Sequence, residues 1–353
     1  MLFANIERSC DLSNTKKVVS MIAQKIVVIS FDHWNYDKYI VHQLKALGHQ
    51  ANHIKIGNFK HKNNLERIKN TFSKVFLGKN PKHIKRQDYI IETLEKLGKQ
   101  DQILVINPEL IDKNYHEKIK NYTSKYISYL YDSVARCNVR HLLDGVFDEV
   151  YSFDKDDIKQ YHFQPTQNYN YIDQNQLKKK NIKQEIVYMA SIDERLKKMY
   201  EIASYLIAHK ISFKIIIVGK KSWKYQLQKK YFRLINKKHP ITNNQIIFRR
   251  KRINQDEMLG LYQESNILLD LVRKNQIGLS FRIFEAMALG KKVITSNSAL
   301  STYDFYNEYN YLIIGEDLEK IEDFVNKPYQ KPTKELYQKY TIAQWVKDVF
   351  KLT

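Results

Sequence analysis

Short apolar runs alternate with segments of helical periodicity along most of the chain. Residues 36–47 carry apolar side chains at helical spacing, and Gly48 stands where a helix would end. The apolar runs of the first half that predict strands are 25–30, 102–108, 125–131 and 147–153. Strands that alternate with helices in this way are typical of a parallel sheet covered on both faces.

The same alternation resumes in the second half. A helical period over residues 196–207 follows the first of these strands. The strands predicted here are 185–191, 213–219, 245–248, 266–271, 291–297 and 311–315. The pattern therefore predicts an α/β protein built from two Rossmann-like parallel-sheet domains.

Breaks in this pattern suggest where the domains divide. We expect an N-terminal domain over residues 1–170 and a C-terminal domain over residues 185–330. Residues 168–184 are polar and lack a clear period, so they are the best candidate for a linker. Residues 331–353 predict a final helix that packs back on the N-terminal domain. Two such domains form a cleft between the carboxyl ends of their strands, where open α/β sheets bind ligands.

Charge adds a preference for anionic partners. The 353 residues include 59 basic and 38 acidic side chains, which gives a net charge of +21. Such a surface favours nucleotides or an anionic membrane surface. Lysines are scattered along the whole chain, although residues 177–183 and 248–252 form clusters. Because no nucleic-acid-binding module or concentrated basic stripe is present, we expect no nucleic-acid partner.

Other bulk features favour a cytoplasmic protein. Cys10 and Cys137 are too few for a disulfide framework. No run of about 18 apolar residues predicts a membrane span. Glu7, Arg8 and Asp11 stand where a signal peptide would need an apolar centre.

Phosphate-loop and metal motifs are absent or weak. The ten glycines are too widely spaced for a dinucleotide fingerprint or a P-loop. The stretch "DKD" at 154–156 has the Asp-x-Asp form with which some sugar transferases hold a divalent metal. Asp154 directly follows a predicted strand, however, and Asp157 falls at a third helical position. Helix capping explains these carboxylates better, so we expect no metal site.

The predicted helix over residues 281–289 is apolar except for Arg282 and Glu285. Gly278 permits a close backbone approach, and Ser280 can cap the helix. A helix N-terminus at the end of a strand favours phosphate, a carboxylate can bind a ribose diol, and an arginine can clamp a diphosphate. An ordinary i,i+3 ion pair on a half-exposed helix accounts for the two charges equally well.

A family resemblance favours the nucleotide-binding alternative. The segment "FEAMALGKKVI" at 284–294 resembles the nucleotide-binding segment of the GT-B glycosyltransferases, Phe-Glu-x-Met-Ala-x-Gly-x-Pro-Val-Ile. The stretches "QIGLSFR", "YDFYN", "YLYDS" and "FDEVYSFDKDD" are similar to a bacterial subset of lipopolysaccharide and capsule enzymes, the glycosyltransferase group 1 and CgeB-like proteins. The resemblance implies a GT-B fold and transfer of a hexose or related sugar from a nucleotide-sugar donor.

The resemblance also implies roles for particular residues. Glu285 would bind the donor ribose in the C-terminal domain, and the acceptor would bind in the N-terminal domain. GT-B enzymes generally stabilise the departing diphosphate with cations and a helix N-terminus, so no metal or other cofactor is expected. Further donor-binding candidates are Gly278, Leu279, Ser280, Arg282, Arg195, Arg249, Arg250 and Lys251. Asp32, His33 and Asp132 are the candidate catalytic residues, because a base is needed near the acceptor if transfer inverts the anomeric centre.

The sequence departs from the family pattern at three places. Ile277 occupies the position of a second family glutamate, eight residues before Glu285. Lys292 replaces the usual proline, and residues 31–34 replace a glycine-rich turn. These departures leave a sugar- or nucleotide-binding protein without turnover as an alternative.

The expected acceptor is a glycan or a lipid-linked glycan at the inner face of the cytoplasmic membrane. The positive charge and an apolar stripe among the lysines of residues 61–86 would suit reversible docking on anionic lipid.

Overall fold

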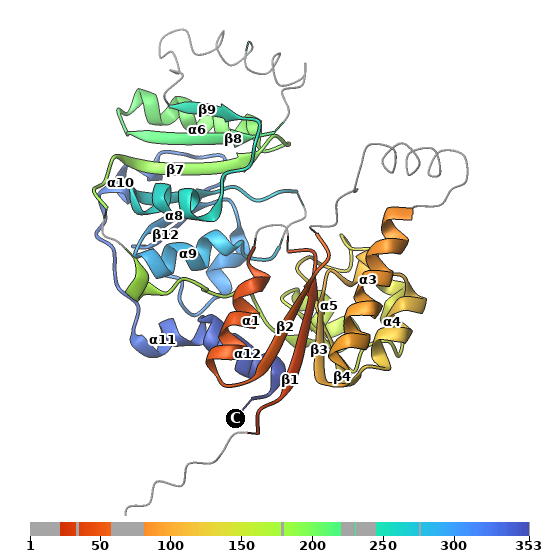
Figure 1. Ribbon diagram of the computed structural model, residues 1–353. Coiled ribbons are helices and arrows are strands. Elements are labelled where there is room, and N and C mark those ends of the chain that lie inside the picture. The colour runs from red at the N-terminus through yellow and green to blue at the C-terminus, as the bar shows by residue number, and fades with distance from the viewer. Residues whose placement is uncertain are drawn as a thin grey trace, which may run out of the picture.

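The computed structural model describes residues 22–32, 35–57, 81–177, 180–219, 230, 245–274 and 277–352. Figure 1 shows two lobes, each built around one sheet with helices on both faces. Both sheets have six strands, and all of their strand pairs are parallel. The predicted α/β fold with two Rossmann-like domains is confirmed.

The N-terminal sheet has the order β2-β1-β3-β4-β5-β6. Its strands are β1 (Lys25–Ser30), β2 (Gln50–Lys55), β3 (Gln100–Ile106), β4 (Thr123–Tyr129), β5 (Glu149–Ser152) and β6 (Gln164–Pro165). The helices are α1 (Asp37–Ala46), α3 (Pro81–Leu97), α4 (Lys113–Lys120) and α5 (Lys155–Tyr161), with short 3-10 turns at Pro108–Leu110 and Arg140–Leu142. Alternate β1 residues face opposite layers: Val27 and Ile29 pack with α3 and α4, whereas Ile26 and Val28 pack with α1.

The C-terminal sheet has the order β12-β11-β10-β7-β8-β9. Its strands are β7 (Gln184–Ser191), β8 (Phe213–Val218), β9 (Ile246–Arg249), β10 (Ser265–Asp270), β11 (Lys292–Thr295) and β12 (Tyr311–Ile313). The helices are α6 (Leu196–Ala208), α8 (Gln255–Gln263), α9 (Phe281–Leu289) and α10 (Lys320–Asn326), with 3-10 turns at Gln174–Gln176 and Ser298–Thr302. One buried cluster joins the sheet to α6 and α10, and another joins it to α8 and α9.

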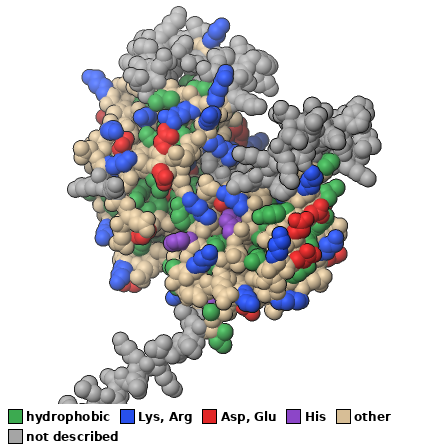
Figure 2. Space-filling view, in the orientation of Figure 1, with side chains coloured by type: hydrophobic (Ala, Val, Ile, Leu, Met, Phe, Trp, Pro, Cys, Tyr) green, Lys and Arg blue, Asp and Glu red, His purple; other side chains and the backbone are tan. Residues whose placement is uncertain are grey.

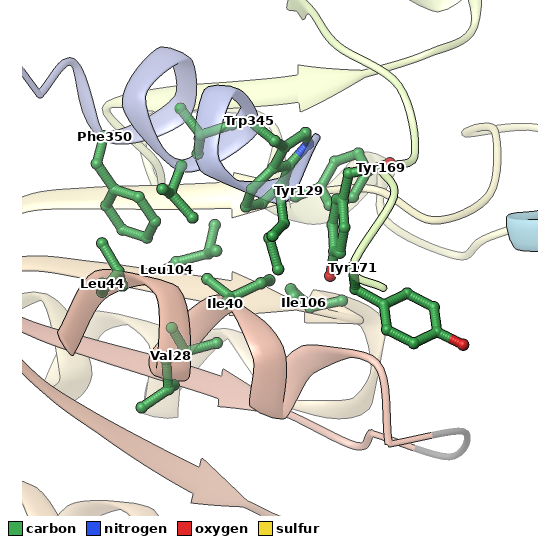
Figure 3. Close-up of a cluster of buried hydrophobic side chains, with 14 of the residues drawn as sticks. Val28, Ile40, Leu44, Leu104, Ile106, Tyr129, Tyr169, Tyr171, Trp345 and Phe350 are labelled. Atoms are coloured by element: carbon green, nitrogen blue, oxygen red, sulfur yellow. The ribbon is translucent and has the colours of Figure 1, made fainter. Parts of the chain in front are cut away.

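The end of the chain returns to the N-terminal domain. Helices α11 (Lys334–Lys339) and α12 (Ile342–Phe350) replace the single predicted helix, because the Thr341 hydroxyl caps a new helix by accepting from the Gln344 N–H. Figure 3 shows Trp345 and Phe350 of α12 above α1 and the sheet. The last helix therefore completes the hydrophobic core of the first domain.

The expected linker is only partly a solvent-exposed connection. Tyr169, Tyr171 and Ile172 are buried in the N-terminal core. Asn170 exchanges backbone hydrogen bonds with the chain around Thr341, at 2.7 Å from its own N–H and 2.8 Å to its carbonyl. The polar neighbours hid these anchors in the sequence pattern, and the anchors fix the connection between the two domains.

Lys292 has a structural reason to stand where the family has proline. Its buried ammonium donates to the carbonyl oxygens of Phe324, Val325 and Lys327 at 2.7–2.8 Å. These carbonyls belong to the end of α10, where helical hydrogen bonding stops. The lysine thus satisfies groups that would otherwise be buried without a partner.

His116 gives the N-terminal core a dependence on pH. Its ring is fully buried, with Nδ1 2.7 Å from the Tyr126 hydroxyl and Nε2 3.0 Å from the Pro108 carbonyl oxygen. Burial lowers the pKa of His116 to about 4, below the unfolded value of about 6.5. The native imidazole is therefore neutral while the unfolded one gains a proton as the pH falls from 6.5, so its stabilising contribution is lost toward pH 4.

We expect His116→Gln to abolish this pH dependence. The difference in free energy of unfolding between wild type and variant should shrink by about 3 kcal/mol from pH 7 to pH 4. Urea unfolding at several pH values measures it. Burial also raises the pKa of Asp37 to about 6, which acts in the opposite sense, but Asp37 is common to both proteins. A difference that stays constant with pH would contradict the assignment.

Candidate functional site

The strand order reverses direction at one point in each sheet. In the C-terminal domain this switch point lies between β7 and β10, and in the N-terminal domain between β1 and β3. The carboxyl edges of the two sheets meet: a Cβ placed on Gly278 would come within 2.4 Å of the Phe153 ring, which follows β5. Ligands of open α/β sheets bind outside such switch points.

Asp270 organises the C-terminal switch point. This residue ends β10, and it is only 1% exposed. Its carboxylate accepts hydrogen bonds from the Ser280 hydroxyl at 2.8 Å, the Arg282 guanidinium at 2.6 Å and the Thr295 hydroxyl at 3.1 Å. The carboxylate thereby ties the start of α9 to β10 and β11.

Arg282 is committed to this structural tie. Besides the ion pair with Asp270, its guanidinium donates to the Met189 carbonyl oxygen at 2.8 Å and to the Tyr262 hydroxyl at 3.2 Å. It therefore links α9 to β7, α8 and β10. An arginine that clamps a donor diphosphate, as expected from sequence, would need to redirect these hydrogen bonds.

Glu285 lies three residues after Arg282 in α9, at the contact between the domains. It is 1% exposed, and its Oε1 accepts from the Tyr171 hydroxyl at 2.5 Å and from the Tyr36 hydroxyl at 3.2 Å. Burial raises the pKa of Glu285, and these two hydrogen bonds and the Arg282 charge offset part of the rise. The two charges of the apolar helix thus have different partners and form no ion pair with each other.

The entrance to α9 is held from both domains. Asn297 donates to the carbonyl oxygens of Ile277 and Gly278 at 3.1 and 3.2 Å, and Asn168 donates to that of Leu279 at 2.8 Å. The Leu279 side chain is buried in the C-terminal core. Ser280 occupies the N-cap position but makes no side-chain cap, because its hydroxyl bonds to Asp270. The expectation that its side chain caps the helix is wrong.

Arg195 forms a cluster with Asp193 and Arg273, two residues that sequence reasoning missed. Its Nε donates to Asp193 at 2.8 Å and its Nη1 to the Leu271 carbonyl oxygen at 2.9 Å, which bridges the loops after β7 and β10. Arg273 also donates to Asp193, at 3.2 Å, and its side chain is 44% exposed. Burial would raise the pKa of Asp193, but hydrogen bonds from Arg195 outweigh it and lower the pKa. Two arginines therefore stand at the switch point.

The other basic candidates lie away from this point. Arg249 ends β9 and pairs with Glu257 of α8, whereas Arg250 and Lys251 are exposed. β9 is the edge strand, two positions from β7 in the sheet. With strands about 4.8 Å apart, these residues start about 10 Å from the switch point.

Asp32 lies in the loop between β1 and α1, where its carboxylate is bonded to other residues of the domain. It is buried, with a φ of 46°, and accepts from the Lys55 ammonium at 3.0 Å and the Asp37 N–H at 3.1 Å. Lys55 offsets its charge and holds its orientation. His33 lies outside the described residues.

Asp132 is the candidate base that faces the other domain. It follows β4 and forms an ion pair with Arg136 at 3.0 Å, and its side chain is 41% exposed. Burial raises the pKa of Asp132, and Arg136 and Arg273 offset part of this rise. Since Arg273 belongs to the C-terminal domain, the carboxylate lies where the two carboxyl edges face each other.

The capping interpretation of "DKD" is confirmed. Asp154 is the N-cap of α5, and its side chain accepts from the N–H groups of Asp156 and Asp157. Asp157 in turn accepts from the Val134 N–H at 2.8 Å. Within the part of the chain that the structure describes, no group of three or more His, Cys, Asp or Glu side chains is arranged to hold a metal ion.

Three solved structures share the two-domain architecture. A trehalose-6-phosphate synthase is 12% identical, with a TM-score of 0.60, and the match covers 93% of this chain and 98% of that chain. The HepE protein of Anabaena, in complex with UDP and glucose, is 11% identical, with a TM-score of 0.50 and coverage of 92% and 95%. A UDP-GlcNAc 2-epimerase from Methanocaldococcus jannaschii is 15% identical, with a TM-score of 0.51 and coverage of 92% and 99%. At these identities the likeness shows the fold, which is the GT-B fold.

The sequence of the second domain resembles a known family. Residues 194–342 match the family described as glycosyl transferase-like, which covers the C-terminal sheet from α6 onward. The chain therefore has the GT-B fold, and residues 194–342 of its C-terminal domain resemble the glycosyl transferase-like family. No curated protein matches the chain in sequence.

We expect Asp270→Asn to destabilise the protein strongly. The amide has nearly the size of the carboxylate but leaves the buried Arg282 charge without its partner. Loss of one member of a buried ion pair costs about 3–5 kcal/mol in the free energy of unfolding. Urea denaturation measures the change.

Glu201→Gln is the matched control for this carboxylate. Glu201 pairs with Lys197 and Lys198 on the surface of α6, at 3.9 and 3.7 Å. Its replacement should change the free energy of unfolding by less than about 1 kcal/mol. Equal losses of unfolding free energy in both variants would show that the Asp270 ion pair stabilises the fold no more than a surface pair does.

Proposed function

We propose that this protein is a glycosyltransferase that moves a sugar from a nucleotide-sugar donor to a surface glycan, in lipopolysaccharide or capsule biosynthesis. The observation that carries the proposal is that Asp193 binds both Arg195 and Arg273 at the carboxyl edge of the C-terminal sheet. The charge of Arg273 also acts on Asp132 of the other domain. Cations at the point where a diphosphate departs and a carboxylate on the opposite domain are the groups that sugar transfer requires.

The donor would bind to the C-terminal domain. The diphosphate would lie before Arg195 and Arg273, and the ribose would reach Glu285 at the adjacent helix. The UDP and glucose bound to the HepE protein, which has the same fold, support a nucleotide-sugar donor for this chain. The resemblance of the α9 segment to the family's nucleotide-binding segment supports the ribose assignment to Glu285.

Transfer breaks the bond between the anomeric carbon and the donor phosphate oxygen. Negative charge grows on the diphosphate, and the two guanidinium groups would stabilise it. In an inverting reaction, Asp132 would take the proton of the attacking acceptor hydroxyl, because it is partly exposed and its pKa is raised. Asp32 is the second candidate, although Lys55 and a backbone N–H already occupy its carboxylate. In a retaining reaction no protein base is required.

We further propose that transfer needs no metal ion. The Asp154 carboxylate of "DKD" is used in the capping of α5, and two arginines stand where a metal would otherwise neutralise the diphosphate. The cationic groups of the chain can supply this stabilisation themselves.

A panel of nucleotide sugars tests donor and metal together. We expect hydrolysis or transfer with at least one donor, unchanged by EDTA. Arg273→Gln should lower kcat/KM by about 10- to 100-fold, because it removes one diphosphate cation. Lys347→Gln, a charge-matched change on the exposed face of α12, should leave it unaltered. Activity that disappears with EDTA and returns with Mg²⁺ or Mn²⁺ would refute metal independence.

The second candidate function is binding without turnover. Ile277 favours it, because this residue stands where the family has a second glutamate. Nucleotide-sugar binding by calorimetry with no product from any donor would establish this alternative.

For the acceptor we propose a lipid-linked glycan at an anionic membrane surface. Figure 2 shows lysines and arginines spread over the visible face of the molecule. No described helix is long and apolar enough to span a bilayer. Of the lysine-rich segment 61–86, residues 61–80 lie outside the described residues, so the support comes from the net charge of +21.

Sedimentation with liposomes tests this docking. We expect the protein to pellet with vesicles that contain anionic phospholipid at low salt, and to be released as the salt concentration rises, because surface charges are screened. Vesicles of neutral phosphatidylcholine are the control. Equal behaviour with both kinds of vesicle would favour a soluble acceptor.

A further inference from the structure

Two phenols of the chain occupy the carboxylate that is proposed to bind ribose. The hydroxyls of Tyr36 and Tyr171 both donate to Oε1 of Glu285. Tyr36 immediately precedes α1, Tyr171 belongs to the connection between the sheets, and Glu285 belongs to α9. One carboxylate oxygen thus joins three distant parts of the chain.

The same tyrosines cover the carboxylate sterically. The Tyr36 ring stacks on Phe281 of α9 at a centroid distance of 4.0 Å, and Tyr171 stacks on Tyr39 of α1 at 4.6 Å. Glu285 is left 1% exposed. A ligand can therefore reach this carboxylate only if α9 separates from the tyrosines.

The two tyrosine hydroxyls donate to Glu285 as the two hydroxyls of a ribose would. A carboxylate oxygen has two lone pairs in its plane, and the two hydroxyls fill them. A ribose offers two neighbouring hydroxyl donors of the same kind. The protein's own donors and the diol are therefore alternatives at Glu285.

We propose that Tyr36 and Tyr171 form an autoinhibitory latch that the donor ribose must displace. This inference rests on the proposed nucleotide function of Glu285. Both tyrosines pack with the N-terminal core, so their displacement parts α9 from α1 and couples nucleotide binding to separation of the domains at this contact. The apparent affinity for nucleotide equals the intrinsic affinity multiplied by the fraction of molecules in which the latch is open.

The latch gives a counterintuitive expectation for phenol removal. Tyr36→Phe and Tyr171→Phe keep the ring stacking but remove a donor to Glu285. Each variant should bind nucleoside diphosphate more tightly, with a Kd lower by about tenfold, the effect of one hydrogen bond to a charged group. Calorimetric titration with UDP, ADP, GDP and CDP measures the change, and cooperative thermal unfolding checks that the variants are folded.

Tyr39→Phe is the matched control. Tyr39 lies in the same aromatic cluster, and its hydroxyl donates across the domain contact to Gln255 at 3.0 Å, not to Glu285. Its Kd should change by less than about twofold. An equal gain in all three variants would show that a looser interface, and not release of Glu285, improves binding, which overturns the latch.

A nucleotide without the diol provides the second test. With 2′,3′-dideoxynucleoside diphosphates, Tyr36→Phe and Tyr171→Phe should bind no more tightly than wild type. Glu285→Gln separates the latch from the function on which it rests. If Glu285→Gln weakens binding of the ribonucleotide while both phenylalanine variants match wild type, the latch alone is wrong. If Glu285→Gln leaves binding unchanged, the ribose assignment fails and the latch with it.

Discussion

The buried ion pair between Asp270 and Arg282 is the constraint on which the candidate site depends. A carboxylate that is 1% exposed at the end of β10 requires strong compensation, and it receives donors from Ser280, Arg282 and Thr295. These contacts fix the rotation of α9 about its axis. Because Arg282 is bonded to β10 and β7, Glu285 on the next turn of the helix faces Tyr36 of the N-terminal domain. The ion pair between Arg282 and Asp270 therefore determines where Glu285, the proposed ribose-binding residue, lies.

The two domains are joined by more than the chain connection. Helix α12 completes the N-terminal core, while Tyr169 and Tyr171 of the connection pack into that same core and reach α9. The contacts that close the site are therefore part of the contacts that hold the molecule together. This arrangement explains why a nucleotide site in this chain would be linked to domain movement, because Glu285 cannot be exposed while the tyrosines remain bonded to it.

The sequence predicts the sheets well because buried parallel strands are continuous apolar runs, such as residues 185–191. It also identifies α9, whose charges mark a special helix. Sequence reasoning missed Asp193, Arg273, Tyr36 and Tyr171. Charged and tyrosine residues are common in this chain, and only tertiary contacts separate these from the rest. Asp270 gave a usable signal, since it is a carboxylate within the apolar run 266–271.

The central claim is that the carboxylate of Glu285 exchanges two phenols for a ribose diol at the edge of the β7–β10 switch point. A crystal structure with bound nucleoside diphosphate tests it most directly. We expect the ribose hydroxyls to donate to Glu285 and the diphosphate to lie beside Arg195 and Arg273. The Tyr36 hydroxyl should then be out of hydrogen-bond distance of Glu285. A nucleotide bound elsewhere, with Tyr36 and Tyr171 still donating to Glu285, would contradict it.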